Sequence, residues 1–165
     1  MLFAKLFAII IGYTLKGGMV MTYSALEVAR YIIHHEAQQR RTVSNLRLQK
    51  LLYFVQAQFA VNATDGQPCF KDRMEAWDFG PVVPVVYREY KYYGSAVIPY
   101  DNCAQASISA RDAMLIDAML DYCAKYSTTA LVRITHEQAP WKDAYRNGFN
   151  NEITPEAIRS YFRRS

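Results

Sequence analysis

One long apolar helix constrains the fold of this chain more than any other feature. It is predicted over Ser44 to Val61, because apolar residues recur there with the 3.6-residue period of an α-helix. The stripe consists of Leu48, Leu51, Leu52, Val55 and Phe59, and Tyr53, Phe54 and Ala57 widen it. A helix this apolar must be covered on more than one side. We therefore expect it to be the central core helix, with Ser44 as its N-cap.

The chain is large enough to cover such a helix within one domain. It has 165 residues, of which 52% are apolar, so a single core can form without disulfides or a structural metal. Its three cysteines, Cys69, Cys103 and Cys123, are odd in number and have no C-x-x-C spacing. This pattern favours reduced thiols in a cytoplasmic protein.

The first twenty residues differ from the remainder. Met1 to Val20 is a hydrophobic leader, and its apolar run, Leu6 to Leu15, is too short to span a membrane. No cleavage site typical of a secretory signal follows it. A purine-rich ribosome-binding sequence, if it were translated in frame, would give Lys16-Gly17-Gly18, and Met21 follows shortly after it. We therefore expect Met21 to be the natural start and residues 21–165 to form the domain. Two lysines lie in the leader, so the net charge of +4 falls to +2 without it.

Capping residues and apolar periodicity predict further helices. They begin after the capping box of Ser24 and Glu27, at Pro84, after Ser109, after Ser127 and after Thr154. We expect Thr135 to Trp141 to interrupt the helix that begins after Ser127, Asp143 to Arg146 to form one helical turn, and His34-His35 to face solvent.

Two short segments are predicted to be strands. Met74 to Phe79 alternates apolar and polar residues and is ended by Gly80-Pro81, and Ala96 to Tyr100 is its expected partner. Residues Asp101 to Ser107 resemble a loop. The predicted fold class is therefore mainly α, a compact single domain of about six helices around a central helix, with a short β-hairpin.

The common catalytic and metal-binding signatures are absent from the sequence. It has no glycine-rich phosphate loop, no G-x-S-x-G, no H-E-x-x-H and no paired cysteines. The most reactive-looking set is His136 with Glu137, Asp78 and Cys69, but a histidine beside a Pro-Trp turn more often fixes that turn. We predict that the chain is not an enzyme and uses no cofactor or metal.

Aromatic residues form two clusters, around residues 77–93 and around Trp141 and Tyr145. They could fill the core, bind a protein partner together with Arg88 and Lys91, or stack on single-stranded nucleic acid. The small net charge makes nucleic acid the weaker choice. The candidate partner-binding residues are Trp77, Phe79, Pro81, Tyr87, Arg88, Tyr90, Lys91, Tyr92, His136 and Trp141.

Four motifs in order resemble the Panacea family of SocA-like antitoxin domains. They are Leu48-Gln-Lys-Leu-Leu-Tyr-Phe54, Ala76-Trp-Asp-Phe-Gly-Pro-Val-Val-Pro84, Thr135-His136 with Pro140-Trp141, and Asn150 to Phe162. The resemblance covers about Ser24 to Phe162. Phe79 departs from it, since a tyrosine is common there.

The resemblance implies an antitoxin, often associated with prophages, that neutralises a co-encoded toxin by direct protein contact. Delivery of the toxin to a cellular protease is a variant of the same role. A small nucleic-acid-binding regulator is the alternative from another class. The sequence does not determine the oligomeric state, and it predicts no membrane association.

Overall fold

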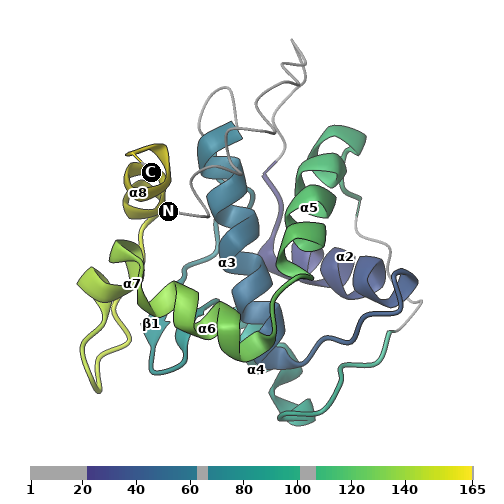
Figure 1. Ribbon diagram of the computed structural model, residues 1–165, viewed down its shortest axis with the longest axis horizontal. Helices are drawn as coiled ribbons and strands as arrows, with labels where there is room; N and C mark the ends of the chain where they lie inside the picture. The colour runs from purple at the N-terminus through teal and green to yellow at the C-terminus, as the bar shows by residue number, and fades with distance from the viewer. Residues whose placement is uncertain (1–21, 63–66, 101–106, 165) are drawn as a thin grey trace.

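The computed structural model describes residues 22–62, 67–100 and 107–164 (Figure 1). The predicted leader, Met1 to Val20, and most of the predicted loop Asp101 to Ser107 lie outside these residues. Within them the chain forms seven α-helices, one 3-10 helix and one two-stranded sheet. The predicted mainly α fold with a minor β element is therefore confirmed. No helix in the described ranges is long and apolar enough to cross a membrane.

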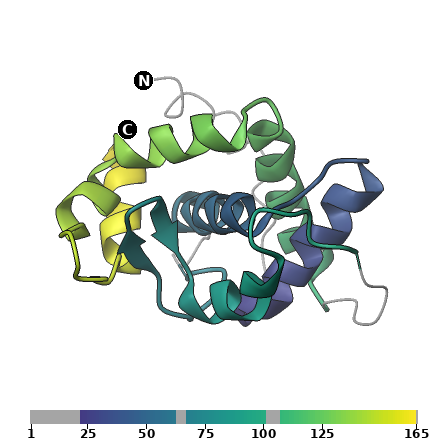
Figure 2. The same ribbon diagram turned by 90° about the horizontal axis from the view of Figure 1, so that it is seen from below.

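The central helix is α3 (Asn45–Asn62), as predicted. Fourteen of its 18 residues are buried, and the other elements surround it (Figure 2). The helices that contact it are α2 (Ala25–Gln38), α4 (Pro84–Tyr90), α5 (Ala110–Cys123), α6 (Thr128–His136) and α8 (Pro155–Arg164). The Ser44 hydroxyl accepts a hydrogen bond from the Arg47 backbone N–H at 3.3 Å, which confirms the predicted cap.

The other predicted caps are also present. Ser24 and Glu27 form the capping box of α2, and Ser109, Ser127 and Thr154 each accept a hydrogen bond from the backbone N–H three residues on. These side chains satisfy N–H groups that the first turn of a helix leaves without partners.

The buried polar residues of α3 hold the non-helical part of the chain. Gln49 accepts a hydrogen bond from the Val83 backbone N–H at 2.9 Å. About two turns further along the helix, the Gln56 side chain donates to the Phe70 carbonyl at 2.9 Å and accepts from the Cys69 N–H at 2.9 Å. These glutamine side chains therefore provide hydrogen-bond partners for the backbone of the non-helical segment, which has few backbone–backbone hydrogen bonds there.

The β-hairpin differs from the predicted one. β1 (Glu75–Trp77) pairs antiparallel with β2 (Gly80–Val82), not with Ala96 to Tyr100. Gly80 has φ +98°, a conformation that suits glycine and allows the chain to reverse after only two residues. The expected partner instead joins the segment before α3, where the Ile98 N–H donates to the Val43 carbonyl. Pairing over so short a loop costs less entropy than pairing across twenty residues.

The predicted break after α6 is also shorter than expected. α6 continues to His136, and only Glu137 and Gln138 separate it from α7 (Ala139–Ala144), which has Pro140 in its first turn. Proline is tolerated there because the first N–H groups of a helix have no partner within it. The predicted turn at Asp143 to Arg146 was therefore placed too late in the chain.

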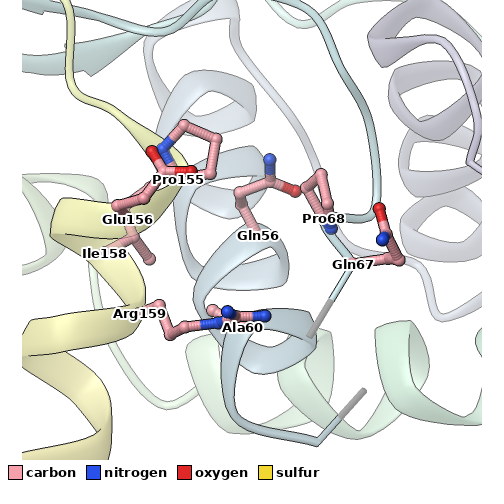
Figure 3. Close-up of a pocket in the computed structure, with 8 residues that line it drawn as sticks. All are labelled: Gln56, Ala60, Gln67, Pro68, Pro155, Glu156, Ile158 and Arg159. Atoms are coloured by element: carbon pink, nitrogen blue, oxygen red, sulfur yellow. The ribbon is translucent and has the colours of Figure 1, made fainter. Parts of the chain in front are cut away.

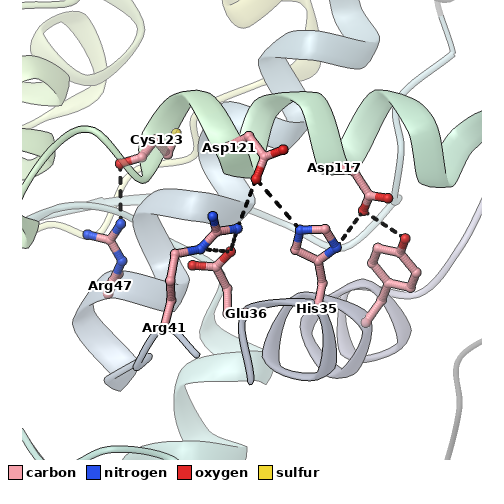
Figure 4. Close-up of polar contacts among 8 residues, drawn as sticks. His35, Glu36, Arg41, Arg47, Asp117, Asp121 and Cys123 are labelled. Carbon is pink, nitrogen blue, oxygen red and sulfur yellow. Dashed lines mark hydrogen bonds and ion pairs between the residues drawn. The ribbon is translucent and has the colours of Figure 1, made fainter. Parts of the chain in front are cut away.

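His35 does not simply face solvent, which corrects the prediction for the histidine pair. Its Nδ1 lies 3.0 Å from Asp117 Oδ1 on α5, and its side chain is 12% exposed (Figure 4). Tyr31 also donates to Asp117, at 2.7 Å. Nearby, Arg41 bridges the buried Glu36 and Asp121 at 2.6 and 3.0 Å. These polar contacts connect α2 and the chain after it to α5.

Candidate functional site

The β-hairpin carries two of the predicted partner-binding aromatics at its end. Phe79 lies in the two-residue loop between the strands and is 67% exposed. Trp77 ends β1, and its ring meets that of Tyr87 on α4 edge to face, with centroids 4.9 Å apart. Trp77 Nε1 donates to Glu75 at 2.9 Å. The Trp77 ring is therefore held in place, whereas Phe79 is free to meet a partner.

The second predicted cluster lies beside the hairpin, although Trp77 and Trp141 are 64 residues apart in the sequence. Trp141 is stacked between His136 and Tyr145, at centroid distances of 4.1 and 4.4 Å. Its Nε1 donates to the Trp77 carbonyl at 2.9 Å, and the Tyr145 hydroxyl donates to Asp78 at 3.1 Å. The two clusters are thus one structure. We refer to Trp77, Phe79, His136, Trp141 and Tyr145 as the aromatic face.

The remaining predicted residues divide into exposed and buried ones. On α4 and the 3-10 helix η2 (Lys91–Tyr93), Tyr92 is 92% exposed, and Tyr87, Arg88 and Lys91 are exposed as well. Tyr90 is half-buried and packs against the core. Pro81 is buried, and only its carbonyl is used, as an acceptor for Lys50. Pro81 therefore supports the hairpin from within.

The sequence reasoning missed Phe149. This side chain is 67% exposed and lies in a tight reversal, Arg146 to Phe149, that contains Gly148 at φ +80°. The following segment runs beside β1, since the Ala76 N–H donates to the Asn151 carbonyl at 2.9 Å. Figure 1 shows this loop and the hairpin projecting in the same direction. The signal in the sequence was a phenylalanine directly after an Asn-Gly turn.

Burial and one hydrogen bond shift the pKa values of groups in the aromatic face and beneath it. It lowers the pKa of Lys50 to about 7. Burial also lowers the pKa of His136, and the nearby charge of Lys50 adds to this effect, while a hydrogen bond with the Asp78 backbone opposes it. The hydrogen bond to Asp78 raises the pKa of Tyr145. At neutral pH His136 is therefore neutral, and it presents an uncharged ring to Trp141.

The reactive-looking set from the sequence comes together only in part. His136 lies near the Asp78 backbone, but Cys69 is fully buried in the core, where burial raises its pKa well above the usual value. A buried thiol of this kind is a poor nucleophile. Among the described residues no group of three His, Cys, Asp or Glu side chains is arranged to hold a metal ion.

A pocket elsewhere has a different character. It has a volume of about 270 Å³ and lies between α3, the segment Gln67-Pro68 and the first turns of α8 (Figure 3). Gln56, Glu156 and Arg159 supply its polar lining. The Gln56 amide is already bonded to the Phe70 and Cys69 backbone, so this part of the lining serves the fold.

Fold and site together define a helical domain that presents a supported aromatic surface. The chain belongs to the family of antitoxin SocA-like, Panacea domains, whose model matches residues 48–142. It is 35% identical over 136 residues to the antitoxin SocA of Caulobacter vibrioides (strain NA1000 / CB15N), a match that covers 75% of this chain and 71% of that protein. The predicted family resemblance is thus confirmed. No solved structure matches the chain significantly.

Proposed function

We propose that this protein is an antitoxin that neutralises a co-encoded toxin by binding it through the aromatic face. Its family, and its similarity to an antitoxin over most of both chains, support the general role. The observation that supports this surface is the exposure of Phe79 at the end of a hairpin whose Trp77 carbonyl is bonded to the stacked Trp141. Aromatic anchors on a preorganised surface contribute a large share of the energy of protein interfaces.

Binding, without chemistry, fits the same surface. Its histidine is stacked against a tryptophan, so that this ring is part of the packed aromatic surface. The exposed charges that flank the aromatic residues have both signs: Arg88, Lys91 and Lys142 against Asp78, Glu89 and Asp143. A nucleic-acid interface would require a basic face, so a protein partner is favoured over a regulator that binds DNA or RNA.

The first test uses the product of the adjoining reading frame. We expect it to arrest growth when it is expressed alone and to be harmless together with this chain. Phe79→Ala should weaken binding about tenfold or more and abolish the rescue, because it removes an anchor that has little role in the fold. The melting temperature should stay unchanged.

Met114→Ala is the matched control, because Met114 is a similarly exposed apolar residue (55%) on α5. It should bind and rescue like the wild type. Equal losses from both variants, or full rescue by Phe79→Ala, would contradict the assignment of the aromatic face. An adjoining product that is harmless by itself would contradict the antitoxin role.

Occlusion and delivery to a protease predict different toxin levels. If the chain acts by occlusion, the toxin should persist in a complex after protein synthesis is stopped. If it acts as an adaptor, toxin abundance should fall only when the chain is present. A pulse-chase measurement of the tagged toxin distinguishes the two mechanisms.

The nucleic-acid alternative has a separate test. If it holds, this protein should bind DNA or RNA, with an affinity that falls steeply between low and high salt.

A further inference from the structure

Lys50 is the only lysine or arginine among the described residues whose side chain is buried. It lies on the central helix α3, on the side that contacts β2 and α6. In the described chain no carboxylate lies within ion-pair distance of its Nζ. Burying an amino group without a counter-charge is costly, so its position calls for a specific role.

The amino group touches the hairpin at one carbonyl. Lys50 Nζ donates to the Pro81 oxygen at 2.7 Å. Pro81 pairs with Ala76 in the hairpin and lies two residues from Phe79. The next residue back, Gly80, is so close that an added Cβ would lie 2.8 Å from Lys50 Nζ and 2.7 Å from Thr135 Oγ1. The hairpin is therefore seated directly on the lysine and on α6.

We infer that Lys50 is a positioning residue for partner binding: through the Pro81 carbonyl it sets the depth at which the hairpin holds Trp77 and Phe79 at the surface. The inference rests on the proposed function. An apolar side chain of the same length could fill the space but could not bond the carbonyl. The hairpin has only three residue pairs, too few to hold their position without support from a helix.

The charge of this amino group should make the position of the hairpin sensitive to pH. The pKa of about 7 places the change between the ammonium and the weaker-donating amine near neutrality. The other ionisable groups near this amino group are few. β2 has no ionisable side chain, His136 lies on α6, and Asp78 lies in the hairpin loop, where it is bonded to Tyr145. On α3 itself, the flanking Arg47 and Tyr53 are bonded elsewhere.

The test begins with the protein without its partner. Trp77 and Trp141 are its two tryptophans, and both lie in the aromatic face, so their indole N–H resonances report on the hairpin. In the wild type we expect both to shift with a midpoint near pH 7. The shift should persist in His136→Gln, which removes the competing titration, and disappear when Lys50→Met is added to His136→Gln.

Binding is then measured for Lys50→Met against Gln58→Met. Gln58 is the matched control, since it is fully buried on the same helix and its amide has no hydrogen-bond partner among the described residues. Lys50→Met should bind the product of the adjoining reading frame at least tenfold more weakly, whereas Gln58→Met should bind like the wild type.

The possible outcomes separate this inference from the proposed function. Wild-type affinity in a folded Lys50→Met, or tryptophan resonances of the wild type that do not move between pH 6 and pH 8.5, would overturn the role of Lys50. If Lys50→Met does not fold, the wild-type and His136→Gln titrations decide. If the wild type itself fails to bind the adjoining product, the proposed function fails, and the titration still tests the lysine.

Discussion

Gly80 illustrates how a single residue can determine the geometry of the aromatic face. Its φ of +98° is strained for any other residue, and an added Cβ would overlap the Lys50 amino group and the Thr135 hydroxyl. Gly80→Ala should lower the free energy of unfolding by about 2 kcal/mol or more, because backbone strain and overlap add. Urea denaturation measures this loss.

Gly148→Ala is the control for Gly80→Ala. Gly148 also has a positive φ, +80°, but a Cβ there would meet nothing within 4 Å. Its substitution should cost less, because only backbone strain applies. If the two variants lose equal stability, the close seating of the hairpin on Lys50 and Thr135 is not what requires glycine at position 80.

Among the elements, α2 and α5 are joined by charged side chains as well as by apolar ones. Glu36 is fully buried, and Arg41 is its ion-pair partner at 2.6 Å. Arg41→Met leaves that carboxylate buried without a cation. We expect a loss of about 2 kcal/mol in unfolding free energy, at the low end for a broken buried pair because Arg41 is partly exposed.

The exposed Arg163, at the end of α8, is the comparison for Arg41. Arg163→Met should change stability little, since exposed charges contribute little on average. The double variant Glu36→Met with Arg41→Met should be more stable than Arg41→Met by itself, because it removes the orphaned carboxylate. A double variant that is less stable than Arg41→Met would show that the pair is not coupled in this way.

For the whole molecule, buried ionisable groups set the pH dependence of stability. The folded pKa of Lys50, about 7, lies below its ordinary value of 10.5, so the unfolded chain binds more protons between these values and stability rises with pH there. The lowered pKa of His136 removes stability as pH falls below 6.5. Burial raises the pKa values of Cys69, Cys123 and Tyr53, so stability falls once pH passes their ordinary values of 9.0 and 10.0.

These opposing effects predict a maximum of the unfolding free energy at about pH 8–9. Urea denaturation between pH 6 and pH 11 checks the position of the maximum. Lys50→Met should flatten the rise between pH 7 and the maximum and leave the alkaline fall in place. Stability that declines steadily from pH 6 to pH 8 would contradict the buried, uncompensated state of Lys50.

Much of this architecture could be predicted from local patterns in the chain. The apolar period of α3 and the caps at Ser24, Ser109, Ser127 and Thr154 depend on residues within a turn or two of each other, so the helices were predicted well. The candidate aromatics at Trp77, Phe79 and Trp141 were identifiable from the motifs that carry the family resemblance.

By itself, then, the sequence determined the helical class, the central helix, the caps and the family. Only the tertiary structure decided that β2 pairs with β1, that Trp141 donates a hydrogen bond to the Trp77 carbonyl, and that Lys50 and Gln49 point inward to hold the hairpin. Those outcomes depend on contacts between residues far apart in the chain, and on polar side chains whose burial is favourable only when a distant backbone group becomes their hydrogen-bond partner.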